Sequence, residues 1–425
     1  MASVGWIDFS SEHRDKVRTV IDLLKKQGVV DELGIGVIRD SFADRLFPGV
    51  STIQTRAKYF TLTALLIHDY ERQAETKKEK QTLEDYLASE EKQCRITLAE
   101  RYGDQGEARG IIGITFGVRR DRDVQRPPSS VYWNGLRTFG IVRTSLSLHE
   151  FSRAIGGRRS LKAVLEGTDN AKGDDHDADL GKGHRVRVPT VDDEYWNNLS
   201  ITLTAGEAEF LRQQITATVS DSLVGQILLD DQATEQLLKL GGNASFPDFA
   251  DLPFVRRLKH NDLRQAVEHA RNFWVILEGA HIRYNCLLQG RFGTSQGKEE
   301  CEGYWDTWRE EIATFDWATW DTDYVWRLVE QHGSKVPEPT RHFVNGWIAE
   351  TRRTVSNPVA CDQLVANQER ANKKSRARLR PGAKDEHVKG WVGLRELDYR
   401  FPQVRTLIED IHRAESGEAD PDVGR

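Results

Sequence analysis

The sequence predicts a mainly α-helical, multi-domain protein with a few short strands. Apolar residues recur at helical spacing along most of the chain, and helix-capping patterns precede several of these stretches. Only two short runs have the composition of strands. With 425 residues, 38% hydrophobic and 30% charged, the chain is long enough for roughly two or three domains of ordinary size.

The first elements expected are a strand at 5–9 and a capped helix at about 10–27. A second helix is predicted at 37–46, before a Pro-Gly turn. Ser51 and the glutamine three residues later have capping-box spacing, so a third helix should begin at Thr52. Its apolar residues cover well over half of its surface, which predicts a mostly buried helix.

The next elements expected are a helix at 83–102, a strand at 109–117 and two short helices at 129–142 and 147–155. Short helical pairs of this kind occur in winged-helix modules. The second and third helices of the chain, joined by a glycine-containing turn, also have the outline of a helix-turn-helix reader of DNA. The N-terminal half is therefore a candidate for a winged-helix-like or helix-turn-helix submodule.

The stretch 167–185 is almost free of apolar residues. Its acidic or metal-capable side chains include Asp169, Asp174, Asp175, His176, Asp177 and Asp179. Their spacing does not fit a calcium loop, so we predict a mobile surface loop that marks a domain boundary, and no metal site. A metal-dependent nuclease would have to use this loop, because it is the only dense carboxylate cluster in the sequence.

Beyond this loop the pattern is almost entirely helical. Thr204 and Glu207 have capping-box spacing, and a long helix with a broad aromatic stripe is predicted at 262–289. Five tryptophans follow: Trp305, Trp308, Trp317, Trp320 and Trp326. Such rings can stack on single-stranded bases, but at helical spacing they favour a core.

These patterns predict five segments. They are an N-terminal α(+β) domain at 1–166, the acidic loop at 167–185, a Trp-rich helical domain at 186–360, a basic helical segment at 361–414 and a disordered tail at 415–425.

The sharpest electrostatic feature is a basic run at 368–384. It has one acid and seven cations, which are Arg370, Lys373, Lys374, Arg376, Arg378, Arg380 and Lys384. The run therefore carries +6, which leaves −12 on the other residues of a chain whose total is −6. A local cationic helix on an acidic protein favours a surface that binds phosphates, although a helix face paired with acids elsewhere has the same composition.

A second candidate contact is the start of the third predicted helix. Arg56 and Lys58 could contact phosphates and Gln54 a base edge, because a helix N-terminus also attracts anions. The apolar character of this helix instead favours a structural role, with the two cations paired to acids such as Asp40 or Asp44. We expect burial first and binding second.

Enzymatic signatures are mostly missing. Phosphate-binding and dinucleotide-binding glycine loops, the nucleophile elbow and zinc motifs do not occur. Glu278 and His281 lie one turn apart in an apolar helix, where a satisfied core pair is favoured over an acid–base pair. The sequence favours a non-enzymatic protein without a cofactor, and the question of activity stays open.

The sequence also predicts a cytoplasmic protein that does not enter a membrane. No run of eighteen apolar residues and no signal peptide is found, and the four cysteines contain no CxxC pair, which fits reduced thiols. Oligomeric state is not predictable from these patterns.

The segments 5–10, 31–60, 128–141, 203–211 and 276–288, together with ERANKKSRARL further on, resemble a bacterial family of about this length catalogued as a domain of unknown function. The resemblance covers nearly the whole chain and is most distinctive at 33–60. Members are often encoded in mobile anti-phage gene clusters, beside helicases and nucleases. The resemblance implies a role in defence and carries over no catalytic residue.

We therefore expect a DNA-binding or scaffolding subunit of an anti-phage system. One alternative is an interaction module whose Trp-rich region and helical faces dock a helicase or nuclease partner. The other is the metal-dependent nuclease described above.

Overall fold

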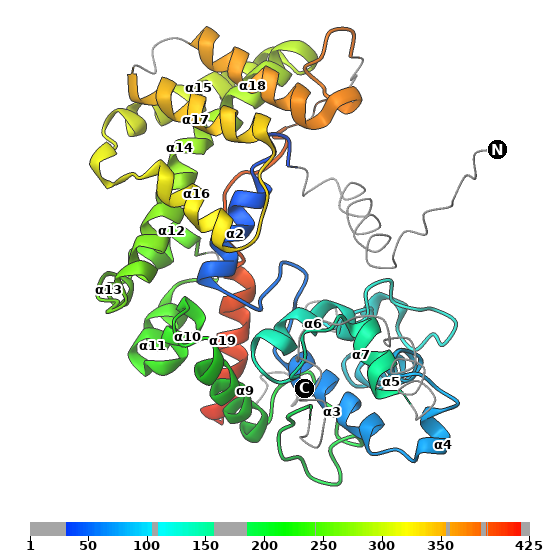
Figure 1. Ribbon diagram of the computed structural model, residues 1–425. Helices are drawn as coiled ribbons and strands as arrows, with labels where there is room; N and C mark the ends of the chain where they lie inside the picture. Colours follow the sequence, from blue (N-terminus) through cyan, green and yellow to red (C-terminus); the bar gives the residue numbers. More distant parts are fainter. Residues whose placement is uncertain are drawn as a thin grey trace, which may run out of the picture. The chain divides into compact units, whose positions relative to one another are not determined.

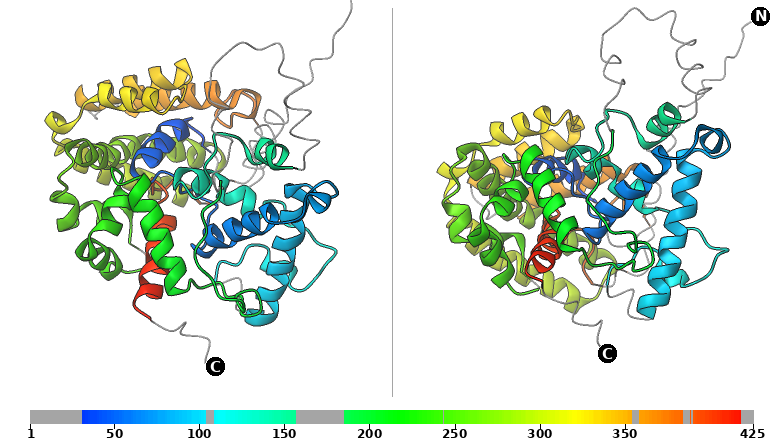
Figure 2. Two further views of the ribbon diagram at one scale, coloured as in Figure 1. Left: turned by 60° about the horizontal axis from the view of Figure 1, so that its bottom comes forward. Right: turned by 90° about the horizontal axis from the view of Figure 1, so that it is seen from below.

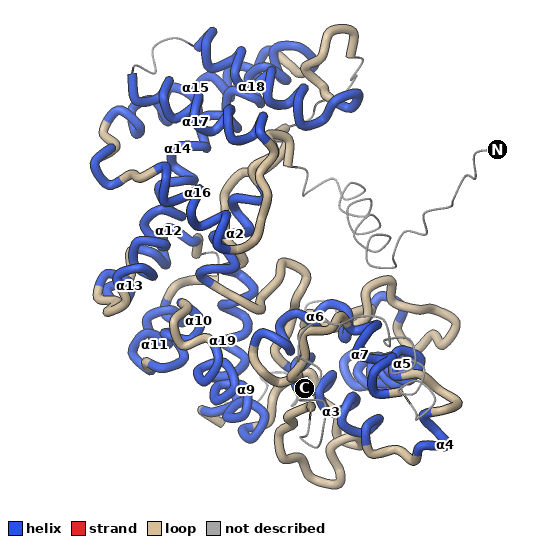
Figure 3. Tube along the Cα trace, viewed as in Figure 1, coloured by secondary structure: helices blue, strands red, loops and turns tan. Residues whose placement is uncertain are grey.

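The structure, a computed structural model, confirms the mainly α-helical class. It describes residues 31–103, 109–156, 185–242, 244–353, 358–383, 388 and 390–417. Within these residues the chain forms helices and loops without a strand, apart from one isolated antiparallel bridge between Val142 and Val186 (Figure 3). The strand predicted at 5–9, the helix at 10–27 and nearly all of the acidic loop lie outside the described residues.

The chain divides into two compact units, each built from segments that are distant in sequence. Unit 1 contains the described parts of 1–42 and 265–397, and unit 2 those of 43–264 and 398–425. The chain passes between them inside α2 (Gly36–Leu46), inside α14 (Asn261–Phe292) and after Leu397. Each unit therefore combines separate stretches of the sequence.

Unit 1 is organised around the long helix α14. Its other helical elements are α15 (Ser295–Ala313), η4 (Trp317–Thr319), α16 (Thr322–Gln331), α17 (Glu338–Arg353), α18 (Pro358–Lys373) and η5 (Lys374–Arg376). Helices α17 and α18 lie side by side (Figures 1 and 2). Gln368 near the end of α18 donates to Thr340 near the start of α17 at 3.1 Å, so the two helices run antiparallel.

Tryptophans form the core of unit 1, as their spacing predicts. Trp305 stacks on Trp308 with ring centroids 5.0 Å apart, and the Trp308 indole donates to the carbonyl of Val275 at 2.7 Å. A side chain at Gly279 would place its Cβ 2.4 Å from the Trp308 ring, so only glycine lets this ring reach α14. Trp320 and Trp326 are also buried, whereas Trp317 is partly exposed.

Unit 2 is organised around α3 (Lys58–Glu71), which packs on three other helices. Helices α5 (Leu83–Tyr102), α6 (Pro128–Thr138) and α9 (Ala205–Thr218) surround it. The remaining elements are α4 (Glu75–Lys78), η2 (Ile114–Phe116), α7 (Leu148–Ile155), α10 (Leu223–Leu229), α11 (Asp231–Lys239), α12 (Phe246–Ala250), α13 (Pro253–Arg256) and α19 (Phe401–Glu415). Helix α19 packs along α9. The predicted burial of α3 is confirmed.

Capping residues place several helix starts where the sequence predicts them. Thr82 accepts a hydrogen bond from the Asp85 amide at the start of α5. Thr204 and Glu207 form a reciprocal capping box at the start of α9. These caps satisfy backbone amides that have no partner within the helix.

The strand predicted at 109–117 is wrong. This stretch forms turns and the 3-10 element η2, and its glycines at 110, 113 and 117 have φ of +70°, +75° and +53°. Positive φ is incompatible with an extended strand and is accessible chiefly to glycine. The apolar residues of this stretch therefore sit in a compact looped segment.

The helix predicted to begin at Thr52 begins instead at Lys58. Before it, the amides of Thr55 and Arg56 donate to the Tyr132 hydroxyl at 2.8 and 3.0 Å, and the Ser51 hydroxyl has no hydrogen-bond partner among the described residues. Only half of the capping box predicted at Ser51 is therefore present, because the Gln54 side chain accepts from the Ser51 amide at 3.2 Å but the Ser51 hydroxyl accepts no bond in return. The connection from α2 spans 47–57, far longer than the turn of about 3–4 residues in a helix-turn-helix, so that prediction is also wrong.

Candidate nucleic-acid interface

The basic segment, defined here as residues 370–380, is not the continuous helix that its composition predicts. Helix α18 ends at Lys373, and Lys374 has a φ of +54°, which an α-helix excludes. One 3-10 turn follows, and the chain then runs irregularly to the glycine at 382. The cations of this segment therefore lie on the last turn of α18 and on the folded loop that follows it.

Glu369, the one acid of the basic run, shapes this loop from inside. Its side chain is fully buried, and its carboxylate accepts hydrogen bonds from the backbone amides of Arg378 at 2.5 Å and Leu379 at 3.3 Å. Burial raises the pKa of Glu369, while these two amides act in the opposite direction. The carboxylate thus folds the chain back on α18 and is withdrawn from the surface.

The end of α18 is anchored to residues 31–34 of the same unit. Lys373 is buried and pairs with Glu32 at 3.2 Å, so it is not an exposed phosphate contact as the sequence suggests. Gln368 donates to the carbonyl of Leu33 at 2.6 Å, and Asn372 donates to the carbonyl of Asp31 at 2.9 Å. These contacts fix the base from which the loop projects.

Four cations of the basic segment are exposed: Arg370, Lys374, Arg376 and Arg380. None of the four forms an ion pair with a described residue. Arg378, which lies between Arg376 and Arg380 in the sequence, is half-buried. Arg370 instead donates to the carbonyl of Ala366 at 2.9 Å. The alternative of a charged face paired with acids does not hold for these four side chains within the described part of the chain.

Arg291 is a further cation that the sequence pattern does not reveal. It lies at the end of α14, is exposed and donates to the carbonyl of Arg378 at 3.4 Å. It is distant from the basic segment in sequence, so only the fold brings the two together. We include Arg291 in the candidate interface.

The second predicted contact is buried in unit 2. Gln54 is 8% exposed, and its amide donates to the carbonyl of Gly49 at 3.1 Å. Lys58 is 2% exposed, and its ammonium lies 2.7 Å from the carboxylate of Glu207. Neither side chain is exposed to a base or a phosphate, in agreement with the burial that the sequence favours for this helix start.

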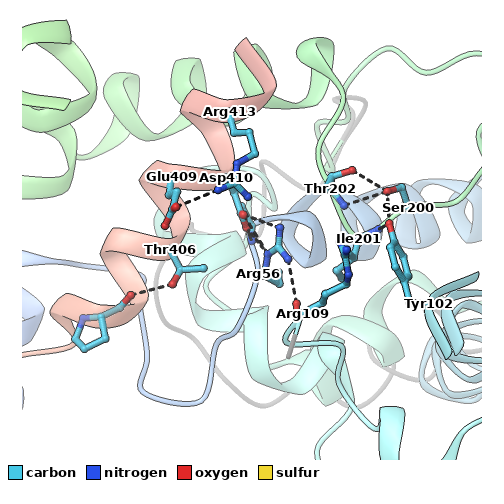
Figure 4. A network of polar contacts seen from close by, with 12 residues as sticks. Arg56, Tyr102, Arg109, Ser200, Ile201, Thr202, Thr406, Glu409, Asp410 and Arg413 are labelled. Carbon is cyan, nitrogen blue, oxygen red and sulfur yellow. Dashed lines mark hydrogen bonds and ion pairs between the residues drawn. The ribbon is translucent and has the colours of Figure 1, made fainter. Parts of the chain in front are cut away.

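Arg56 is also engaged inside unit 2. Its guanidinium binds the Asp410 carboxylate in bidentate fashion at 2.8–3.0 Å and donates to the carbonyl of Arg109 at 3.0 Å (Figure 4). Asp410 also accepts from the amide of Ala57 at 2.8 Å and thereby holds the start of α3. A structural role through ion pairs is thus correct for Arg56 and Lys58, although the partners differ from Asp40 and Asp44.

Glu278 and His281 do not form the core pair favoured from the sequence. No hydrogen bond joins them, and both ring nitrogens of the fully buried His281 lack a partner among the described residues. Burial lowers the pKa of His281 to about 4, so its ring is neutral at pH 7. Burial and the carboxylates of Glu311 and Glu396 raise the pKa of Glu278 to about 7.

Other chemistry is sparse in the part of the chain that the structure describes. No group of three or more metal-ligating side chains gathers there, and no described helix is long and apolar enough to span a membrane. All four cysteines are buried and free. Among the predicted site residues, the exposed cations of the basic segment are the ones best placed to bind a ligand.

The fold and this loop define a mainly α-helical protein with a local cationic surface. The chain belongs to a family of unknown function (DUF6361), whose model matches residues 1–414. No curated protein and no solved structure matches it.

Proposed function

We propose that the protein is a non-enzymatic, DNA-binding or scaffolding subunit of a bacterial anti-phage system. The basic segment and Arg291 bind phosphates, and a helicase or nuclease is the partner protein. The cellular setting is supported by the resemblance described above. The DNA-binding part is supported by one observation, which is that four exposed cations on the last turn of α18 and the loop after it have no ion-pair partner among the described residues.

The charge distribution explains why DNA binding would depend on this one surface. The chain is acidic overall, so its bulk field repels a polyanion. Cations that have no carboxylate partner can displace the counterions condensed on DNA, and that release supplies most of the binding free energy at low salt. Binding should therefore depend on this surface and on ionic strength.

Changing Arg370, Arg376 and Arg380 together to Glu is expected to weaken DNA binding at about 50 mM salt by about 100-fold or more. The change removes three phosphate contacts and adds three repulsive charges. Fluorescence anisotropy with labelled single- and double-stranded DNA measures the effect.

The matched control changes Lys77, Lys80 and Lys239 to Glu, three exposed cations of unit 2 that alter the net charge equally. We expect this variant to bind within about threefold of the natural protein. An equal loss in both variants would contradict a dedicated surface. Capture of a protein partner at high salt, with no DNA binding at low salt, would favour the interaction module instead.

The variant Glu369→Gln separates loop geometry from charge. It removes a negative charge, so charge alone predicts tighter DNA binding. It also weakens the carboxylate contact to the amides of Arg378 and Leu379, so the geometry predicts binding that is about 3- to 10-fold weaker. Tighter binding in the same anisotropy assay, with unchanged thermal unfolding, would show that the loop conformation is irrelevant.

A further inference from the structure

Unit 1 also contains a groove, and none of the residues that line it belongs to the basic segment. It has a volume of about 630 Å³ and lies between α16 and α17. Its lining includes Thr322, Asp323, Trp326, Arg341, Asn345, Ile348, Ala349, Arg352 and Arg353. This volume is within the usual range of roughly 300–1,000 Å³ for small-molecule sites. Three cations and one carboxylate line it, so the groove favours an anion.

One side of the groove follows directly from helical spacing on α17. Arg341, Asn345, Ile348 and Arg352 recur at intervals of four, three and four residues, which places them along one face. The two arginines stand about 16 Å apart along the helix axis. They therefore mark the two ends of the groove.

Aromatic rings hold both arginines in place. The Arg352 guanidinium lies 5.1 Å from the centre of the Trp317 ring, and Arg352 is exposed with no acidic partner among the described residues. The Arg341 guanidinium lies 4.7 Å from the centre of the Trp326 ring and pairs with Glu330 at 2.9 Å. Stacking on a ring restricts a guanidinium without using its hydrogen-bond donors. Arg352 is thus a positioned and unneutralised cation.

The Arg341 end of the groove also offers polar groups. The Asn345 side-chain oxygen accepts from the Trp326 indole at 3.1 Å, and its amide nitrogen has no partner among the described residues. Asp323 supplies a carboxylate that can accept hydrogen bonds. This end therefore combines a flat guanidinium plane with one donor and one acceptor group, which suits the edge and face of a nucleobase.

We propose that this groove binds a nucleoside phosphate. Arg352, with Arg353 beside it, holds the phosphate, and the base lies over Arg341 with its edge toward Asn345 and Asp323. The ligand is either a free nucleotide or the phosphorylated end of a nucleic-acid strand, because both present the same chemistry. The site does not depend on the proposed role of the basic segment.

Calorimetric titration of the full chain with AMP, adenosine and inorganic phosphate tests this site. We expect AMP to bind at least about tenfold more tightly than either adenosine or phosphate, since only AMP contacts both ends of the groove. Arg352→Ala should weaken AMP binding by about tenfold or more. Arg327→Ala is the matched control, because Arg327 is exposed on α16 and pairs with Asp321 outside the groove, and it should leave AMP binding unchanged.

Trideoxyadenylates with and without a 5′-phosphate distinguish the two sources of the ligand. Binding of the phosphorylated form that Arg352→Ala weakens identifies a strand end, and binding of AMP alone identifies a free nucleotide. Absence of AMP binding at millimolar concentration, phosphate binding as tight as AMP binding, or an equal loss in Arg327→Ala would overturn the site. The triple Glu variant of the basic segment should bind AMP normally, so failure of one proposal is distinguishable from failure of the other.

Discussion

Replacing Lys58 with methionine is expected to lower the free energy of unfolding by about 3–5 kcal/mol. The Lys58 ammonium lies 2.7 Å from Glu207, and both side chains are almost fully buried. Glu207 also accepts from Thr61 at 2.7 Å, from Tyr195 at 2.8 Å and from the amide of Thr204 at 2.8 Å. Removing the cation leaves this carboxylate without a counter-charge in the core. Urea unfolding of the two proteins measures the loss.

A double-mutant cycle separates the ion pair from simple packing. Glu207→Gln alone should also destabilise, because burial already lowers the pKa of Lys58 and the Glu207 carboxylate opposes that effect. The double variant Lys58→Met, Glu207→Gln should be more stable than the sum of the two single losses predicts, by about 1–3 kcal/mol. Strict additivity would show that the two charges are not energetically coupled.

Glu91 is expected to make the free energy of unfolding fall as the pH rises from about 4.5 to about 8. Its carboxyl is buried, and burial raises its pKa from 4.5 to about 8 although the Ser129 amide and hydroxyl donate to it. Between these two pH values the folded state retains a proton that the unfolded state has lost. Stability is therefore lost as pH rises through this window, by roughly 3–5 kcal/mol in total, and levels off above it.

The variant Glu91→Gln isolates this effect because its amide does not titrate. Relative to the natural protein it should be nearly neutral at pH 5 and should gain several kcal/mol at pH 9, on the order of the same 3–5 kcal/mol. Denaturant unfolding at both pH values gives the difference. A constant difference between the two proteins across this range would contradict a protonated Glu91 in the folded state.

Local signals in the sequence account for much of the helical structure. Helix 83–102 agrees with α5 at both ends, because Thr82 caps its start and the glycine at 103 follows its last residue. The tryptophan spacing likewise predicts the core of unit 1. These features depend on neighbours within one or two turns, which a single sequence contains.

The failures arise where distant residues decide the conformation. The Tyr132 hydroxyl and the Asp410 carboxylate accept hydrogen bonds from backbone amides that precede α3. Helix α3 therefore starts later than its own residues indicate. Three glycines at positive φ turn an apolar stretch into a loop, although its pattern resembles a strand.

The candidate sites show the same division. The composition of the sequence is enough to locate the basic segment. It does not predict that Lys373 is buried in an ion pair with Glu32 or that the Glu369 carboxylate points inward. Arg291 reaches the segment only through the fold. The spacing of Arg341, Asn345 and Arg352 is visible in the sequence, but the rings that position the arginines come from other elements.

The salt dependence of DNA affinity tests the central claim most directly. The logarithm of the binding constant should fall linearly with the logarithm of salt concentration, with a slope of about −4 for the exposed cations of the basic segment and Arg291. In the variant with Glu at 370, 376 and 380, any residual binding should have a slope smaller in magnitude by about 3. A slope near zero, or the same slope in both proteins, would contradict phosphate binding by this surface.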